Sequence, residues 1–96
     1  MNEYLIKMLL AGEVIIIFRK KENGLLRNLI GTLEVKSIPP EHLSTWSTLI
    51  ESYEYDPNQE RIVVWDTEKN DWRSFYIETV LSVQQSEIKD QTQLEE

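Results

Sequence analysis

The chain has 96 residues and a hydrophobic fraction of 41%, the size and composition of one globular domain with a modest core. It contains no cysteine, which excludes a disulfide framework and a thiolate metal site. The net charge of −7 is uneven, because residues 1–50 carry six basic and five acidic residues whereas residues 51–96 carry four and twelve. An acidic half opposes non-specific binding to nucleic acid. It is compatible with docking on a basic protein surface or with DNA mimicry, and the plainer alternative is that it only favours solubility.

The N-terminal segment is apolar but is interrupted by Glu3 and Lys7, and no charged leader precedes it. We therefore expect neither a signal peptide nor a membrane span, and we expect a soluble cytoplasmic protein. Apolar residues recur at helical spacing up to Gly12, which predicts a short amphipathic helix over residues 3–11.

The next segment, VIIIFR, is a β-branched run that predicts a strand at about residues 13–20. Asn23-Gly24 supplies the residues that a tight hairpin turn needs, and a second strand is predicted at about residues 25–35. Gly31 lies in the middle of that strand, which indicates a bulge or a sharp bend.

Paired prolines at positions 39 and 40 interrupt the strand pattern, and residues 40–43 are predicted to form one helical turn. Residues 51–60 are predicted to form an acidic loop with a turn at Asp56-Pro57-Asn58 and two outward-pointing tyrosines, Tyr53 and Tyr55. The segment between the second and third predicted strands is expected to be anchored to the core by three apolar residues, Trp46, Leu49 and Ile50.

The stretch from Arg61 to Val83 predicts a central hairpin, with strands at residues 61–66 and 72–78 joined by a polar loop. A tight turn around residues 78–80 then leads into a last short strand at residues 80–84. Residues 1–83 are thus predicted to form one domain. Residues 84–96 are polar and lack aromatic side chains, so we expect a frayed tail or a weak helix.

The central hairpin and the segments before it resemble the end of a WYL domain and, more closely, small phage-encoded WYL-like proteins with an Sm-like SH3 β-barrel. The resemblance covers about Leu9 to Val83. The matching residues are Leu10, Gly12, Lys20, Lys21, Gly24, Leu33, Ile38, Pro39, Pro40, Asp66, Lys69, Trp72, Arg73, Ser74 and Phe75.

The resemblance implies a mainly β fold, a small five-stranded SH3/Sm-like barrel with a short N-terminal helix, and a phage origin. WYL domains are viewed as sensors of nucleotides or nucleic acid that use arginines on the strand after the hairpin. This chain retains Arg73, but the next two expected cationic positions are Tyr76 and Thr79. The Trp-Tyr-Leu signature falls at residues 60–62, where only the apolar third position, Ile62, survives.

No residue pattern points to catalysis. His42 is the only histidine and has no nucleophile motif beside it, so a satisfied or solvent-exposed histidine is the expectation. Three carboxylates in one loop, at Asp66, Glu68 and Asp71, lack the spacing of a calcium loop. We therefore predict no cofactor and no metal.

Basic and aromatic residues of the types that hold phosphates and stack on bases suggest a ligand surface. The plainer alternative is that the tryptophans fill the core and the cations pair with neighbouring carboxylates. The wider set is Arg19, Lys20, Lys21, Arg27, Arg61 and Arg73 with Trp65, Trp72, Tyr53, Tyr55 and Tyr76. The ligand-binding residues predicted from it are Arg73, Trp72, Arg61, Tyr76, Lys20 and Lys21.

These patterns predict a non-enzymatic phage accessory protein that acts by binding a host protein or a nucleotide-type ligand, and so inhibits a host defence or another host factor. The protein-binding surface is predicted at Glu51, Glu54, Asp56 and Glu60. The alternative is a regulator of the WYL or Sm type that binds RNA or DNA, which the net charge disfavours. Homo-oligomers through strand edges are a further expectation.

Overall fold

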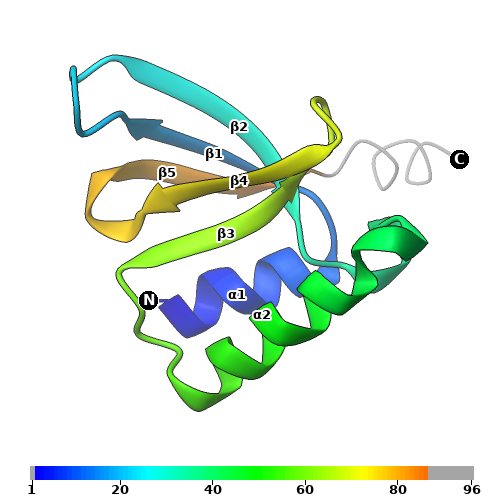
Figure 1. Cartoon of the computed structure of the whole chain (residues 1–96). Helices are drawn as coiled ribbons and strands as arrows, with labels where there is room; N and C mark the ends of the chain where they lie inside the picture. Colours follow the sequence, from blue (N-terminus) through cyan, green and yellow to red (C-terminus); the bar gives the residue numbers. More distant parts are fainter. Residues whose placement is uncertain (1, 87–96) are drawn as a thin grey trace, which may run out of the picture.

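The computed structural model describes residues 2–86 and contains two α-helices, five strands and three single 3-10 turns (Figure 1). The last ten residues, to which most of the predicted tail belongs, lie outside the described residues. The elements are α1 (Asn2–Ala11), β1 (Val14–Arg19), β2 (Leu26–Thr32), η1 (Val35–Ser37), η2 (Pro40–His42), α2 (Leu43–Tyr55), β3 (Arg61–Asp66), β4 (Asp71–Tyr76), η3 (Ile77–Thr79) and β5 (Val80–Gln85).

All five strands form one antiparallel sheet in the order β4-β3-β2-β1-β5, which confirms the predicted mainly β fold with an N-terminal helix. The β1–β2 and β3–β4 hairpins are each paired along their full length. In contrast, β2 and β3 pair only at Gly31–Asp66 and Thr32–Trp65. The two hairpins therefore diverge from this junction and leave an open side between them.

The core lies between the curved sheet and α1. Side chains alternate along each strand, so every second residue points into the core. Val14 and Ile16 of β1, Ile62 and Val64 of β3, and Phe75 of β4 are buried to within 2% of full burial. Leu9 closes the α1 end of this core, and its carbonyl accepts hydrogen bonds from the amide of Leu33 and the hydroxyl of Thr32. Hydrogen bonds thus fasten α1 to the end of β2.

Gly31 allows the closest approach between the two hairpins. A Cβ atom added there would lie 2.5 Å from Cγ2 of Val64, so no larger residue fits without displacement. The β1–β2 register ends at the Val14–Gly31 pair and has no shift, so of the two predicted alternatives, a bulge or a sharp bend, the bulge is absent from this pairing. The glycine makes room for the β2–β3 junction instead.

The prediction of an acidic loop over residues 51–60 is wrong for its first half, because η2 continues into the 13-residue helix α2. Trp46, Ile50 and Tyr53 recur at helical spacing and turn one face of α2 toward the core. Trp46 donates its indole N–H to the carbonyl of Leu33 at 2.8 Å, which anchors the helix as expected. The predicted turn is present at Asp56, whose Oδ1 accepts the amide of Asn58.

The two tyrosines of α2 behave differently. Tyr55 points to solvent as predicted, whereas Tyr53 is buried, which corrects the expectation that both point outward. Its hydroxyl accepts the amide of Val63 at 2.8 Å and donates to the carbonyl of the same residue at 3.1 Å. Tyr53 thereby satisfies backbone groups of β3 where no β2 strand pairs with them. No helix in the described part of the chain is long and apolar enough to cross a membrane.

Candidate functional site

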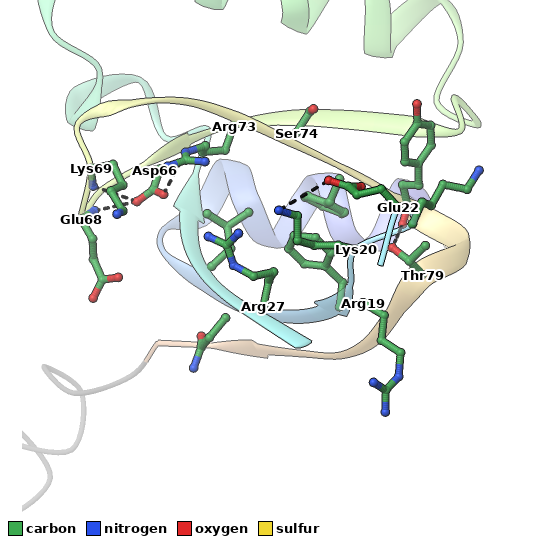
Figure 2. A pocket seen from close by; sticks show the side chains of 16 residues that line it. Arg19, Lys20, Glu22, Arg27, Asp66, Glu68, Lys69, Arg73, Ser74 and Thr79 are labelled. Carbon is green, nitrogen blue, oxygen red and sulfur yellow. Dashed lines mark hydrogen bonds and ion pairs between the residues drawn. The ribbon is translucent and has the colours of Figure 1, made fainter. Parts of the chain in front are cut away.

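A cleft of about 360 Å³ opens on the side where the two hairpins diverge (Figure 2). One wall comes from the β1–β2 hairpin and the other from β4 and the loop before it. The floor is apolar, made by Phe18, Leu29 and Phe75, and the rings of Phe18 and Phe75 lie 5.7 Å apart. The cleft thus combines an apolar base with two strand walls.

The walls concentrate positive charge in an otherwise acidic protein. Six of the ten basic residues of the chain line the cleft against three acidic ones, which gives +3 where the whole chain carries −7. The basic residues are Arg19, Lys20, Lys21, Arg27, Lys69 and Arg73, and the acidic residues are Glu22, Asp66 and Glu68. This is where an anionic ligand experiences the least repulsion.

Three of these cations already have partners at the hairpin end of the cleft. Lys20 lies 3.5 Å from Glu22, and Arg19 donates to the carbonyl of Gly24 at 2.9 Å. Lys21 lies 2.8 Å from the carboxylate of Glu78 and 4.3 Å from the centre of the Tyr76 ring. The hydrogen bond with Glu78 raises the pKa of Lys21 above its ordinary value. Lys21 therefore links the hairpin tip to the end of β4.

The other end of the cleft holds cations with free donors. Nε of Arg73 lies 3.7 Å from Oδ2 of Asp66, and its guanidinium forms no hydrogen bond with a side chain or backbone group among residues 2–86. Arg27, on the opposite wall, forms no ion pair with any residue between positions 2 and 86. Figure 2 shows Arg27 and Arg73 on different walls of the cleft, with Asp66 between Arg73 and Lys69. Two guanidinium forks thus face one apolar floor.

Asp66 has a structural role in the hairpin loop. Its Oδ1 accepts hydrogen bonds from the amides of Glu68 and Lys69, at 2.9 and 3.0 Å. Only 6% of the surface of Asp66 is exposed. These bonds satisfy the loop backbone, and Asn70 completes the turn with a positive φ of 56°. Within residues 2–86, no group of three acidic or histidine side chains is placed to hold a metal ion.

Four of the six predicted ligand-binding residues line the cleft: Arg73, Tyr76, Lys20 and Lys21. Arg61 and Trp72 do not. Side chains alternate along a strand, so Trp72 lies on the face opposite Arg73 and contacts Trp65, with 5.2 Å between ring centres. Arg61 pairs with Tyr76 across the hairpin, and its guanidinium lies 3.4 Å from Oγ of Ser74 at the border of the cleft. The structure thus places four of the six residues around the cleft and two outside its lining, and their role in ligand binding stays a prediction.

His42 belongs to the aromatic cluster on this second face. Its Nδ1 accepts the indole N–H of Trp72 at 3.3 Å, and its ring centre lies 4.9 Å from that of Trp65. The imidazole thus has a packing partner and a hydrogen-bond donor, which agrees with the expectation of a satisfied histidine. The wider aromatic set divides in the same way, because Trp65 and Tyr53 are buried and Tyr55 points to solvent.

Lys69 and the phenylalanine floor were missing from the predicted site. Two signals in the sequence indicate them: Lys69 occupies the loop directly before β4, and Phe75 follows Arg73 at the strand spacing of two. Phe18 and Arg27 face each other in the β1–β2 register, which only the hairpin pairing reveals.

A family model described as WYL_2, Sm-like SH3 beta-barrel fold, matches residues 2–81. The chain belongs to this family. A search of the curated proteins found no match, and neither did a search of the solved structures. The matched range contains both helices, the first four strands and the whole of the cleft, so the WYL_2 assignment agrees with the five-stranded sheet.

The predicted protein-binding residues of this WYL_2 protein lie on α2 and on the segment that follows it, and none of them lines the cleft. Glu51 and Glu54 are exposed on α2, and Asp56 and Glu60 are exposed on the segment that leads to β3. In Figure 1 this segment and α2 lie below the sheet, whereas the β1–β2 hairpin projects above it. Glu51, Glu54 and Asp56 therefore lie apart from the basic residues of the cleft, whereas Glu60 lies near Lys21.

Proposed function

We propose that this WYL_2 protein is a non-catalytic binding module whose cleft holds a phosphate-bearing ligand of the nucleotide type. The observation that carries the proposal is the pair of guanidinium groups, from Arg27 and Arg73, that face one apolar floor from opposite walls. A guanidinium presents donors in a fork that matches phosphate oxygens, and charge-assisted bonds of this kind are stronger than neutral ones.

The chemistry of the cleft favours a small ligand over a long nucleic acid. The local excess of three positive charges is enough for one or two phosphates. A long strand would also have to pass the surrounding acidic surface of a chain with a net charge of −7, which weakens backbone binding. The half-buried ring of Phe18 supplies apolar contact for a base or sugar, and the buried ring of Phe75 supports it from 5.7 Å. A small nucleotide therefore fits this cleft better than an RNA regulator's target does.

A binding role without turnover is supported by how the candidate catalytic groups are used. The chain has one histidine and no cysteine, and the histidine's Nδ1 accepts a hydrogen bond from Trp72 on the face away from the cleft. The carboxylate of Asp66, within the cleft, is bonded to two loop amides. The Sm-like SH3 barrel is in general a non-catalytic fold.

The biological part of the proposal is that a phage uses this cytoplasmic protein to sequester a nucleotide signal of a host defence. It is supported by the resemblance to phage-encoded WYL-like proteins and by a cleft suited to a small anion. A stoichiometric contact with a host protein, through Glu51, Glu54, Asp56 and Glu60, is the second form of the proposal. Its support is that all four acidic residues are exposed near the end of α2.

The test is a calorimetric titration of the purified protein with adenosine monophosphate, adenosine and a ten-nucleotide oligouridylate. We expect the monophosphate to bind and the nucleoside to bind at least tenfold more weakly, because the phosphate meets Arg27 and Arg73. Arg27→Gln and Arg73→Gln should each weaken binding at least tenfold.

Arg61→Gln is the matched control, because it removes the same charge from a residue of the same hairpin that does not line the cleft. It should leave the affinity within twofold of the wild type. If adenosine monophosphate does not bind, or if Arg61→Gln reduces binding as much as Arg73→Gln does, the proposal is wrong. Preferential binding of the oligouridylate would instead support the RNA-binding alternative.

A further inference from the structure

The tip of the β1–β2 hairpin exposes two adjacent leucines. Leu25 and Leu26 have 61% and 55% of their surface exposed. The backbone beneath them is held by three hydrogen bonds, from Lys20 to the carbonyl of Leu25, from Gly24 to the carbonyl of Lys20, and from Leu25 to Oδ1 of Asn23. Single exposed apolar residues are ordinary, but two neighbours on a fixed turn make a candidate contact surface.

Basic residues surround these leucines. Residues 19–27, here named the hairpin knob, carry four basic side chains and one acidic side chain, for a net charge of +3. In Figure 1 the knob projects from the sheet on the side away from α1 and α2. The knob is therefore a convex surface that is both apolar and basic.

A complementary concave surface lies between the two helices. The helix groove has a volume of about 270 Å³ and an apolar base made by Ile6, Leu10 and Ile50. The acidic residues Glu3 and Glu54 stand on its two walls, one on each helix. The remaining lining residues are Lys7, Tyr53 and Pro57.

The charge of the helix groove is opposite to that of the knob. Glu51 and Asp56 are exposed beside Glu54 on the same end of α2. Together with Glu3, Glu54 and the single cation Lys7, they give four negative charges and one positive charge, or −3. The apolar base suits leucine side chains, and the acidic walls suit the lysines and arginines around them.

We propose that the hairpin knob of one copy of this chain docks in the helix groove of a second copy. The two surfaces lie on opposite sides of the molecule, so a chain cannot place its own knob in its own groove (Figure 1). The contact is head to tail, which leaves one free knob and one free groove in any open assembly. Further copies can then be added at the free knob and the free groove until the assembly closes into a ring.

A knob of this size buries less than a standard interface, so each contact is weak, in the range of about 10 µM to 1 mM. The groove shares no residue with the cleft, although the knob includes five residues of the cleft lining, among them Arg27. The inference goes beyond the proposed ligand site because it assigns the groove and the two leucines, which do not line the cleft. It also uses a different surface from the strand edges, at which oligomers of such a sheet would first be expected.

Sedimentation of complementary variants tests the proposal. The knob variant is Leu25→Ser with Leu26→Ser, and the groove variant is Leu10→Gln with Glu54→Lys. All four positions are exposed, so circular dichroism should show both variants folded. Over about 10 µM to 1 mM, the wild type should increase in average mass and each variant alone should remain monomeric.

The equimolar mixture of the two variants gives the decisive result. The knob variant retains an intact groove and the groove variant retains an intact knob, so the mixture should form one-to-one dimers and nothing larger. Glu41→Lys makes the same charge change as Glu54→Lys but at the start of η2, so it should associate like the wild type. Arg73→Gln should also associate normally, which separates this inference from the ligand proposal.

Three outcomes would overturn the proposal. The first is a wild type that stays monomeric over the whole range. The second is an assembly that persists in either variant alone, because that would place the interface elsewhere. The third is a mixture of folded variants that remains monomeric while the wild type associates.

Discussion

The two faces of the β3–β4 hairpin differ in what their side chains contact. On the face toward α2, Trp65 and Trp72 meet edge to face and contact His42. On the other face, Arg73 and Phe75 line an open cleft, and 43% of the Arg73 side chain is exposed. Adjacent residues of one strand thus serve packing on one side and a solvent-filled site on the other.

This difference teaches that stability and ligand contact are separable in a small barrel. A strand places successive side chains on opposite faces, so a mutation at position 72 and one at position 73 act on different properties. We expect substitution of the buried Trp65 to change the free energy of unfolding, and substitution of the exposed Arg73 to change affinity. Three predictions test this separation, from the largest effect to the smallest.

Trp65→Ala should destabilise the fold by about 3–5 kcal/mol, because the indole is 3% exposed and its removal leaves a large cavity. Urea unfolding followed by circular dichroism measures the change. Arg73→Gln is the comparison on the cleft face and should stay within about 0.5 kcal/mol of the wild type, as an exposed substitution usually does. An Arg73 variant that lost as much stability as Trp65→Ala would contradict the separation.

Tyr53→Phe should destabilise the protein by about 1–3 kcal/mol, because it leaves the amide and the carbonyl of Val63 without their partner. The ring and its packing are retained, so the loss reports the hydroxyl alone. Tyr55→Phe changes the same atom on a side chain that is 92% exposed, and we expect no measurable loss. Equal effects of the two changes in urea unfolding would refute the assignment of Tyr53 as a cap for β3.

Alkaline pH should weaken the fold through the same hydroxyl. Burial is the main cause that raises the pKa of Tyr53 above its ordinary value of 10.0. The unfolded chain therefore ionises this group first, and its contribution is complete below pH 10.0 and is lost as the pH rises through the folded-state pKa. Stability measured between pH 8 and 11.5 should fall less steeply in Tyr53→Phe than in the wild type.

The hairpins could be predicted from local residues, and α2 could not be distinguished from a loop. β-Branched runs and the Asn-Gly turn indicated β1 and β2, and alternation indicated β4. The predicted second strand extended to residue 35, but β2 ends at Thr32, where its hydroxyl bonds to the carbonyl of Gly12 and the chain turns away. The last residues of α2, ESYEY at positions 51–55, have the composition of an acidic loop. Their helical conformation follows from the burial of Tyr53 against β3, which the local sequence does not show.

The amino-acid sequence by itself determined which stretches are strands, where the tight turns lie, and that one half of the chain is acidic, because these properties depend on neighbouring residues. Tertiary structure decided which basic residues share a cleft. Arg27 and Arg73 are 46 positions apart (73 minus 27), and only the divergence of the two hairpins beyond the β2–β3 junction at Gly31 places them on opposite walls. Tertiary structure also separated Trp72 from Arg73, because His42 and Trp65 pack against Trp72 whereas Arg73 lines the open cleft.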